Sequence, residues 1–72
     1  MQLERDRAAL SSMTTALADL TERLTAMAES YSGTPREDVA SDLFEVERAL
    51  RTAARRLDRL LGTMGGGRGR GA

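Results

Sequence analysis

The side chains with chemical potential in this sequence are hydroxyls, carboxylates and guanidinium groups, and they do not assemble into a catalytic set. Four hydroxyls gather at Ser11, Ser12, Thr14 and Thr15, but the chain has no His or Lys that could serve as their base. It also has no Cys, which excludes a thiolate nucleophile, a disulfide framework and a zinc–thiolate site within this sequence. The sequence therefore predicts a protein that is not an enzyme.

The carboxylates do not suit a metal site. Helical bundles that hold two metal ions use inward-facing Glu residues together with a Glu-x-x-His motif. Here the central heptad positions of the predicted helices carry no acid, and His is absent. The glycine run 65–67 lacks the strand and the following helix that frame a phosphate-binding loop. We therefore expect no catalytic residue, no metal and no cofactor.

Arginine provides the strongest chemical signal. A row of arginines can follow phosphates, so nucleic-acid binding is one interpretation. The other interpretations are a solvated face that neutralises the acids of a second copy, and a surface for an acidic protein. The 11 basic residues are balanced by 11 acidic ones, and no aromatic residue lies in the row, which favours the solvated or dimer-neutralising interpretation. Four of these arginines share the outer face of a predicted helix, and two more follow it: Arg48, Arg51, Arg55, Arg59, Arg68 and Arg70.

Two long amphipathic helices are expected to position these side chains, because hydrophobic residues recur at alternating steps of three and four. Residues 3–31 predict one helix of roughly 40 Å, with no Gly or Pro and with small residues beside its apolar positions. Residues 35–61 predict a second helix of similar length. The heptad positions that we expect to hold the core and a dimer together are Leu10, Met13, Leu17, Leu20, Leu24, Met27, Val39, Leu43, Val46, Leu50, Leu57 and Leu60.

A short hinge over residues 32–34 separates the two predicted helices. Gly33 suits the left-handed conformation that ends a helix, and Thr34 is placed to cap the next one. Pro35 then occupies the first helical position, and Glu37 is placed to reach back to the Thr34 amide in a capping box. Because so short a connection makes neighbouring helices antiparallel, we expect a helical hairpin.

The expected fold is an all-α, antiparallel two-helix hairpin over residues 1–64 that dimerises into a four-helix bundle. Gly62 is a plausible stop for the second helix, and residues 65–72 are expected to form a disordered Gly/Arg tail. A lone hairpin would expose an apolar groove, which soluble monomers avoid. The second helix has five acids over 37–47 and five bases over 48–59. Antiparallel pairing with its own copy near Arg48 to Leu50 would set acids beside bases, and the rival occupant of the groove is a helix of another protein.

The function expected from this organisation is protein–protein interaction. The chain would be an adaptor, docking or regulatory protein acting as a homodimer, and the alternative is a nucleic-acid-binding accessory protein. Phe44 and Leu61 lie off the heptad positions and, with the arginines, form the candidate partner surface. No apolar run approaches the roughly 18 residues of a membrane span, and the N-terminus lacks the apolar core of a signal peptide. We therefore expect a cytoplasmic protein that does not act at a membrane.

Overall fold

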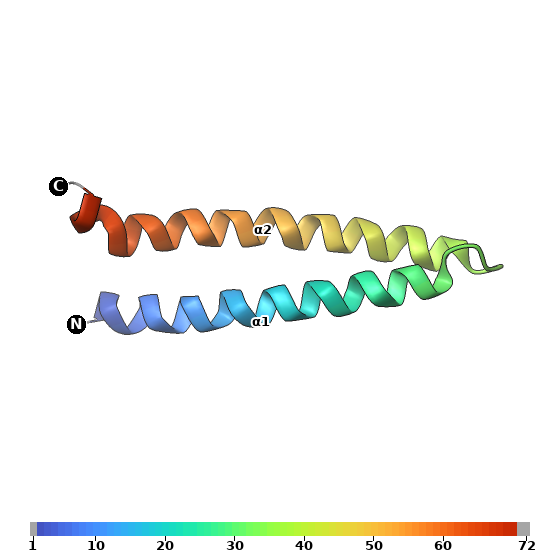
Figure 1. Cartoon of the computed structure of the whole chain (residues 1–72), viewed down its shortest axis with the longest axis horizontal. Helices are drawn as coiled ribbons and strands as arrows, with labels where there is room; N and C mark the ends of the chain where they lie inside the picture. Colours follow the sequence, from blue (N-terminus) through green and yellow to red (C-terminus); the bar gives the residue numbers. More distant parts are fainter. Residues whose placement is uncertain (1, 71–72) are drawn as a thin grey trace.

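The computed structural model describes residues 2–70, with side chains through Met64, as two long helices folded into a hairpin (Figure 1). Helix α1 spans Gln2–Tyr31 and helix α2 spans Glu37–Arg70. The two helices run antiparallel and side by side, and the molecule measures 54 × 19 × 13 Å. The predicted all-α hairpin is therefore confirmed, and α1 has nearly the bounds that its sequence predicts.

The hinge turns at Gly33, whose φ of +78° lies in the left-handed region where a side chain would be strained. Thr34 caps the following turn as predicted, since its Oγ1 accepts a hydrogen bond of 3.2 Å from the Arg36 N–H. The predicted capping box is wrong. The Thr34 N–H donates to the Tyr31 carbonyl oxygen at 3.2 Å, so it is already bonded and does not need Glu37.

A different ion pair closes the first turn of α2. Arg36 donates through Nε and Nη2 to the two carboxylate oxygens of Asp38, each at 3.0 Å. This bidentate bond from the guanidinium lowers the pKa of Asp38. Both side chains are exposed, so the pair orients the hinge without adding much to stability.

Helix α2 differs from its predicted bounds at both ends. It begins at Glu37 rather than at Pro35, and it extends to Arg70 rather than ending at Leu61. Gly62 is an ordinary helical residue, because it lacks a positive φ and a Cβ there would meet nothing within 4 Å. The backbone over 65–70 is helical instead of forming the predicted disordered tail. Residues 71–72 and the side chains of Arg68 and Arg70 lie outside the described part of the chain.

The two helices meet through small side chains. Ala28 is completely buried, Ala40 and Thr21 nearly so, and these are the buried residues of the described chain. Small residues at a helix crossing let the two backbones approach closely. No large side chain in the described part is fully buried, so the hairpin has a narrow line of contact in place of a hydrophobic core.

Candidate docking face

The surface of α1 that touches α2 is rotated from the predicted heptad positions. Leu10, Leu17 and Leu24, which are spaced by seven residues, are half-buried as predicted, whereas Tyr31 at the end of the series is exposed. The second set of contact residues comes four positions after each leucine and is small. The predicted set, three positions after each leucine, is exposed. Along α1 the residues that alternate toward α2 are Leu10, Thr14, Leu17, Thr21, Leu24 and Ala28.

The same rotation holds in α2. Its leucine series is half-buried as predicted, and so is Val39, but Val46 and Leu60 are exposed. One of the positions that replace them carries an acid, Glu47, which corrects the expectation that no acid occupies a central position. We call the residues of both helices that face each other the contact line. On α1 they are the six residues named above, and on α2 they are Ala40, Leu43, Glu47, Leu50, Ala54, Leu57 and Leu61.

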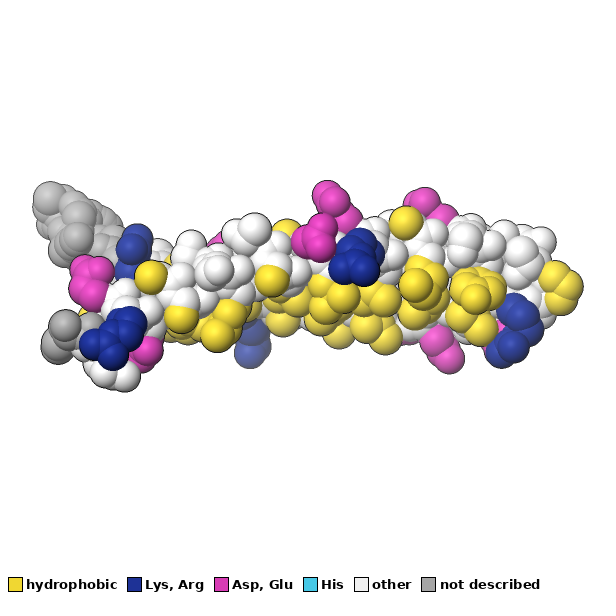
Figure 2. Space-filling view, turned by 90° about the horizontal axis from the view of Figure 1, so that it is seen from below, with side chains coloured by type: hydrophobic (Ala, Val, Ile, Leu, Met, Phe, Trp, Pro, Cys, Tyr) yellow, Lys and Arg dark blue, Asp and Glu magenta, His cyan; other side chains and the backbone are white. Residues whose placement is uncertain are grey.

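The displaced large side chains lie together on one broad side of the hairpin. In both helices they follow the leucine series by three positions, so they are turned about 60° to the same rotational side of it. Two antiparallel helices packed side by side are related by a two-fold axis that runs perpendicular to the broad sides of the hairpin. Rotation about this axis exchanges the helices but keeps each broad side in place. The two series of large residues therefore lie on the same broad side. Figure 2 shows hydrophobic side chains gathered along one side of the molecule for most of its length. We call this surface the apolar face, and it consists of Met13, Leu20, Met27, Val46, Ala53 and Leu60.

The apolar face is open to solvent over residues 13–27 of α1 and 46–60 of α2. Its five large side chains are between 45% and 58% exposed, with Met13 the most exposed and Leu60 the least. Scattered hydrophobic residues are normal on a protein surface, but a continuous stripe over both helices marks an interaction site. The apolar face is therefore our candidate docking surface.

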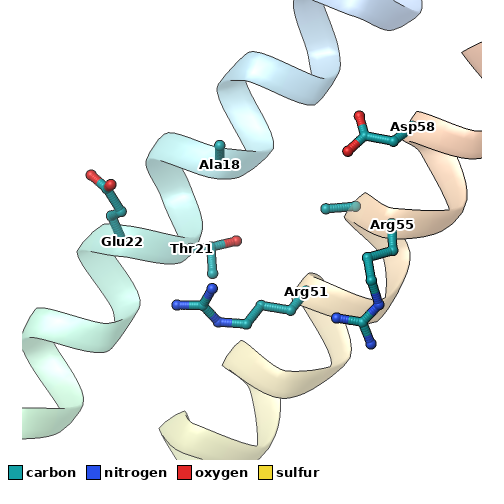
Figure 3. Close-up of a pocket in the computed structure, with 7 residues that line it drawn as sticks. Ala18, Thr21, Glu22, Arg51, Arg55 and Asp58 are labelled. Atoms are coloured by element: carbon teal, nitrogen blue, oxygen red, sulfur yellow. The ribbon is translucent and has the colours of Figure 1, made fainter.

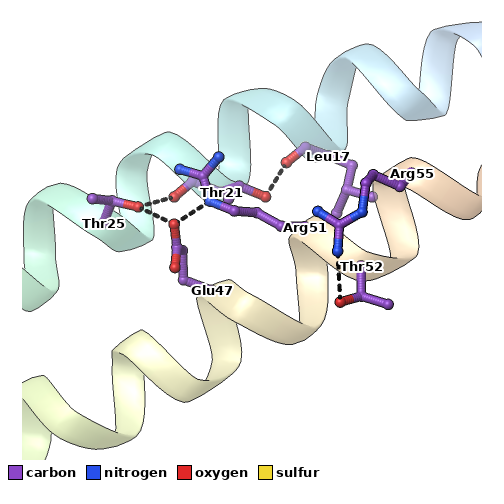
Figure 4. A network of polar contacts seen from close by, with 7 residues as sticks. All are labelled: Leu17, Thr21, Thr25, Glu47, Arg51, Thr52 and Arg55. Carbon is purple, nitrogen blue, oxygen red and sulfur yellow. Dashed lines mark hydrogen bonds and ion pairs between the residues drawn. The ribbon is translucent and has the colours of Figure 1, made fainter. Parts of the chain in front are cut away.

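On the opposite broad side lies a cluster of polar contacts, with the one hydrogen bond that joins the two helices among the described side chains (Figure 4). Glu47 points from α2 toward α1, and its side chain is only 15% exposed. Its Oε2 accepts a hydrogen bond from Arg51 Nε, and it lies 3.2 Å from Thr25 Oγ1. The Thr25 hydroxyl is also 3.1 Å from the Thr21 carbonyl oxygen, and its single proton serves one acceptor at a time. These bonds hold the carboxylate at the edge of the contact line.

The hydrogen bond and charge of Arg51, with the Thr25 hydroxyl, lower the pKa of Glu47. A carboxyl whose pKa is lower in the folded state stabilises the fold above its unfolded pKa of about 4.3, and this contribution disappears as the pH falls through the folded pKa. We therefore expect Glu47→Gln to lower the melting temperature at neutral pH and to have little effect in strong acid. Thermal unfolding followed by circular dichroism at several pH values measures this difference. Glu45→Gln on the exposed side of α2 is the matched control, and an equal deficit at every pH would contradict the assignment.

A shallow hollow of about 300 Å³ opens beside this cluster (Figure 3). It exists because three small residues leave space between the helices, and Arg51 extends from α2 toward Thr21 across it. Two arginines and two acids line it, so their charges balance and the hollow favours neither an anion nor a cation. Its lining residues are Ala18, Thr21, Glu22, Arg51, Ala54, Arg55 and Asp58.

The arginine row is turned away from the apolar face, with Arg51 and Arg55 at the hollow between the helices and Arg48 and Arg59 farther around α2. Its members are partly occupied within the helix. Arg51 is bonded to Glu47, Arg48 Nη1 lies 4.0 Å from Glu45 Oε2, and Arg55 Nη2 lies 3.4 Å from a threonine hydroxyl one turn earlier. Acids of the same helix thus offset part of the positive charge. The row consists of Arg48, Arg51, Arg55 and Arg59.

Of the other members of the predicted partner surface, Leu61 is turned away from the arginines, whereas Phe44 lies one helical turn before Arg48 on the same side of α2. Both are half-buried. Leu61 belongs to the contact line, and Phe44 lies one position beyond Leu43, about 100° around the helix on the polar side. The exposed large residues on the heptad positions predicted to hold both the core and a dimer lie on the apolar face. The sequence predicted an exposed apolar groove, but it did not predict the rotation that turns these residues away from the contact between the helices.

Among the described residues, neither helix contains a stretch that is both long and apolar enough to cross a membrane. Residues 2–70 also contain no group of three side chains suited to holding a metal ion. Comparison of the chain with protein-family models, with curated proteins and with solved structures finds no match. The apolar face is therefore the feature from which a function can be argued.

Proposed function

We propose that this chain is a small non-enzymatic protein–protein interaction module that acts as a homodimer, with the apolar faces of two hairpins packed together in a four-helix bundle. The observation that supports this is the exposure of five large hydrophobic side chains on one side of a hairpin that fully buries no large side chain. Four-helix bundles bury such faces by adding a second layer of helices. A second copy supplies that layer with an identical surface.

The large side chains of the apolar face supply the energy for association. They lie over residues 13–27 of α1 and 46–60 of α2, about 21 Å along each helix. Fully burying one large aliphatic side chain contributes about 1.5–3 kcal/mol. Because the side chains of the apolar face are about half exposed, each retains a substantial part of that contribution for association.

The bundle would keep its polar sides free for further partners. When two apolar faces pack together, the arginine row and the flank that carries Phe44 remain on the outside of each copy. An adaptor, docking or regulatory role uses such a surface, since aromatic and arginine side chains contribute most to many protein interfaces. A matching acidic protein is the partner that this outer surface suits.

Sedimentation equilibrium over the micromolar range tests the homodimer. We expect a mass of twice the chain's 7.8 kDa, with dissociation to 7.8 kDa only on strong dilution. Adding salt should change the association little, because the contacts are apolar rather than ionic. A mass of 7.8 kDa throughout the micromolar range would overturn the proposal.

A further inference from the structure

We propose that the hairpin has a second docking surface, on the side away from the apolar face, which binds an acidic amphipathic helix of another protein. The surface consists of Phe44, Arg48, Arg51 and Arg55, and we call it the Phe44 stripe. The proposal rests on the adaptor role proposed above and specifies its outer partner. It does not depend on the homodimer, because the stripe belongs to a single hairpin.

The four side chains of the stripe form one row along α2. Their spacing of four, three and four residues places them within about 60° of the helix circumference. The first and last members are eleven residues apart, which is about 17 Å or three helical turns. A second helix that lies along the row can therefore contact every member of it.

Phe44 has no place in the other two surfaces of the hairpin. It lies outside both the contact line and the apolar face, and it is half-buried rather than covered. It is also the only phenylalanine of the chain. Aromatic and arginine side chains contribute most to many protein interfaces, and here Phe44 and Arg48 lie one helical turn apart on the same side of α2. This pairing supports a binding role for the stripe.

The arginines of the stripe lie in the basic half of the hairpin. Residues 48–59 of α2 carry five arginines and one acid. The contact between Thr25 and Glu47 sets residues 13–24 of α1 beside them, and this segment carries two acids and one arginine. The net charge of this half is therefore +3, which attracts an acidic partner and repels a basic one.

The guanidinium groups of the stripe keep most of their hydrogen-bond donors available. Each guanidinium has five N–H donors. Arg51 uses Nε to bind Glu47, and Arg55 Nη2 lies 3.4 Å from a threonine hydroxyl. Arg48 Nη1 is 4.0 Å from Glu45 Oε2, which is beyond hydrogen-bond distance. Carboxylates of a partner can therefore form charge-assisted bonds to these groups, which are stronger than neutral hydrogen bonds.

The hollow beside the stripe suits an uncharged side chain of the same partner. Arg51 and Arg55 line it together with Ala18 and Ala54, whose small side chains leave it open (Figure 3). The charges around the hollow balance, so a charged side chain gains nothing by entering it. The expected partner helix thus has an apolar residue against Phe44, another at the hollow three turns away, and carboxylates between them.

A synthetic helical peptide tests this assignment. The probe is an alanine-based peptide of about 20 residues, long enough to be partly helical in water. It carries two leucines eleven residues apart, with glutamates four and seven residues after the first leucine, which copies the spacing of the stripe. Fluorescence anisotropy of the labelled peptide measures its binding to the full chain. We expect binding that weakens as salt is added, and a peptide with glutamine in place of both glutamates should bind about tenfold more weakly.

Arg48→Glu should weaken binding of the peptide about tenfold or more, because it removes a charge-assisted bond and adds a like charge. Replacing one glutamate of the peptide with lysine should restore binding to this variant. Arg56→Glu is the matched control, since it makes the same charge change on α2 about 100° around the helix from Arg55. Phe44→Ala should weaken binding of the leucine peptide but not of a peptide with alanine in place of both leucines.

Three outcomes would overturn the proposal. They are no binding at peptide concentrations up to about 1 mM, an equal loss in Arg48→Glu and Arg56→Glu, and tighter binding of a DNA oligonucleotide through the same arginines. The mass of the chain is measured in the same samples. A monomer that binds the peptide would overturn the homodimer and leave the stripe standing, whereas a dimer that does not bind it would overturn the stripe alone.

Discussion

Replacing Leu20 with Glu is expected to dissociate the homodimer, weakening association by about 100-fold or more, while the hairpin stays helical. Leu20 is 46% exposed in the hairpin, so a carboxylate there remains solvated in the monomer. In the dimer, the carboxylate of each copy would be buried between the two apolar faces, and burying a charge there costs several kcal/mol. Every 1.4 kcal/mol corresponds to a tenfold change in affinity. Sedimentation equilibrium measures the association, and far-ultraviolet circular dichroism measures the helicity.

The matched control is Ala26→Glu. It adds the same charge to the same helix, at an exposed position on the side away from the apolar face. We expect this variant to dimerise like the unmodified chain. If Leu20→Glu dimerises with unchanged affinity, the apolar face is not the interface. If both variants lose the dimer, charge on α1 in general is responsible rather than the apolar face.

The hairpin itself was predictable because its signals are local. Gly33 is where only glycine adopts the required φ without strain, and Thr34 caps the turn after it. An uninterrupted heptad spacing on either side of them predicted two helices that pack along their leucines. The end of α2 was predicted less well, since a single glycine such as Gly62 is compatible with a helix interior when no tertiary contact ends the helix there.

The rotation of each helix was not predictable from hydrophobicity. In α1, Leu10, Leu17 and Leu24 are each followed by a large residue at the third position, as at Met13, and by a small one at the fourth, as at Thr14. The two flanks lie about 100° apart on the helix, and maximal burial favours the large one. Close approach of the backbones favours the small one, and the hairpin packs that way. The row of Thr14, Thr21 and Ala28 was the available signal.

The apolar face follows from that rotation. Sequence reasoning assigned its residues to positions that hold both the core and a dimer, and the structure leaves them outside the contact between α1 and α2. Glu47 gives a second reason for the rotation, because the chosen packing sets its carboxylate between Thr25 and Arg51. The alternative packing would have turned Val46 inward and Glu47 toward solvent. The position of Glu47 could not be predicted from the hydrophobic pattern alone. A charge near a helix contact is favourable only when its hydrogen-bonding partners are present, and the pattern does not show those partners.

Ala28→Leu tests this account of the packing, and we expect it to be the most destabilising single change to the hairpin. Ala28 has no exposed surface at all and belongs to the contact line between the two helices. Extra methylenes at a packed position typically cost about 1–3 kcal/mol, because neighbours must shift to admit them. In a domain of this size, each kcal/mol lowers the melting temperature by about 4–8 °C.

Ala26→Leu provides the comparison, because the same substitution two residues earlier falls on an exposed position of α1. Thermal unfolding by circular dichroism should show a large drop in melting temperature for Ala28→Leu and little change for Ala26→Leu. A melting temperature of Ala28→Leu equal to that of the unmodified chain would mean that small residues do not set the helix spacing. The helices could then rotate to bury Met13 and Leu20 against α2, and the apolar face would no longer need a second copy to cover it.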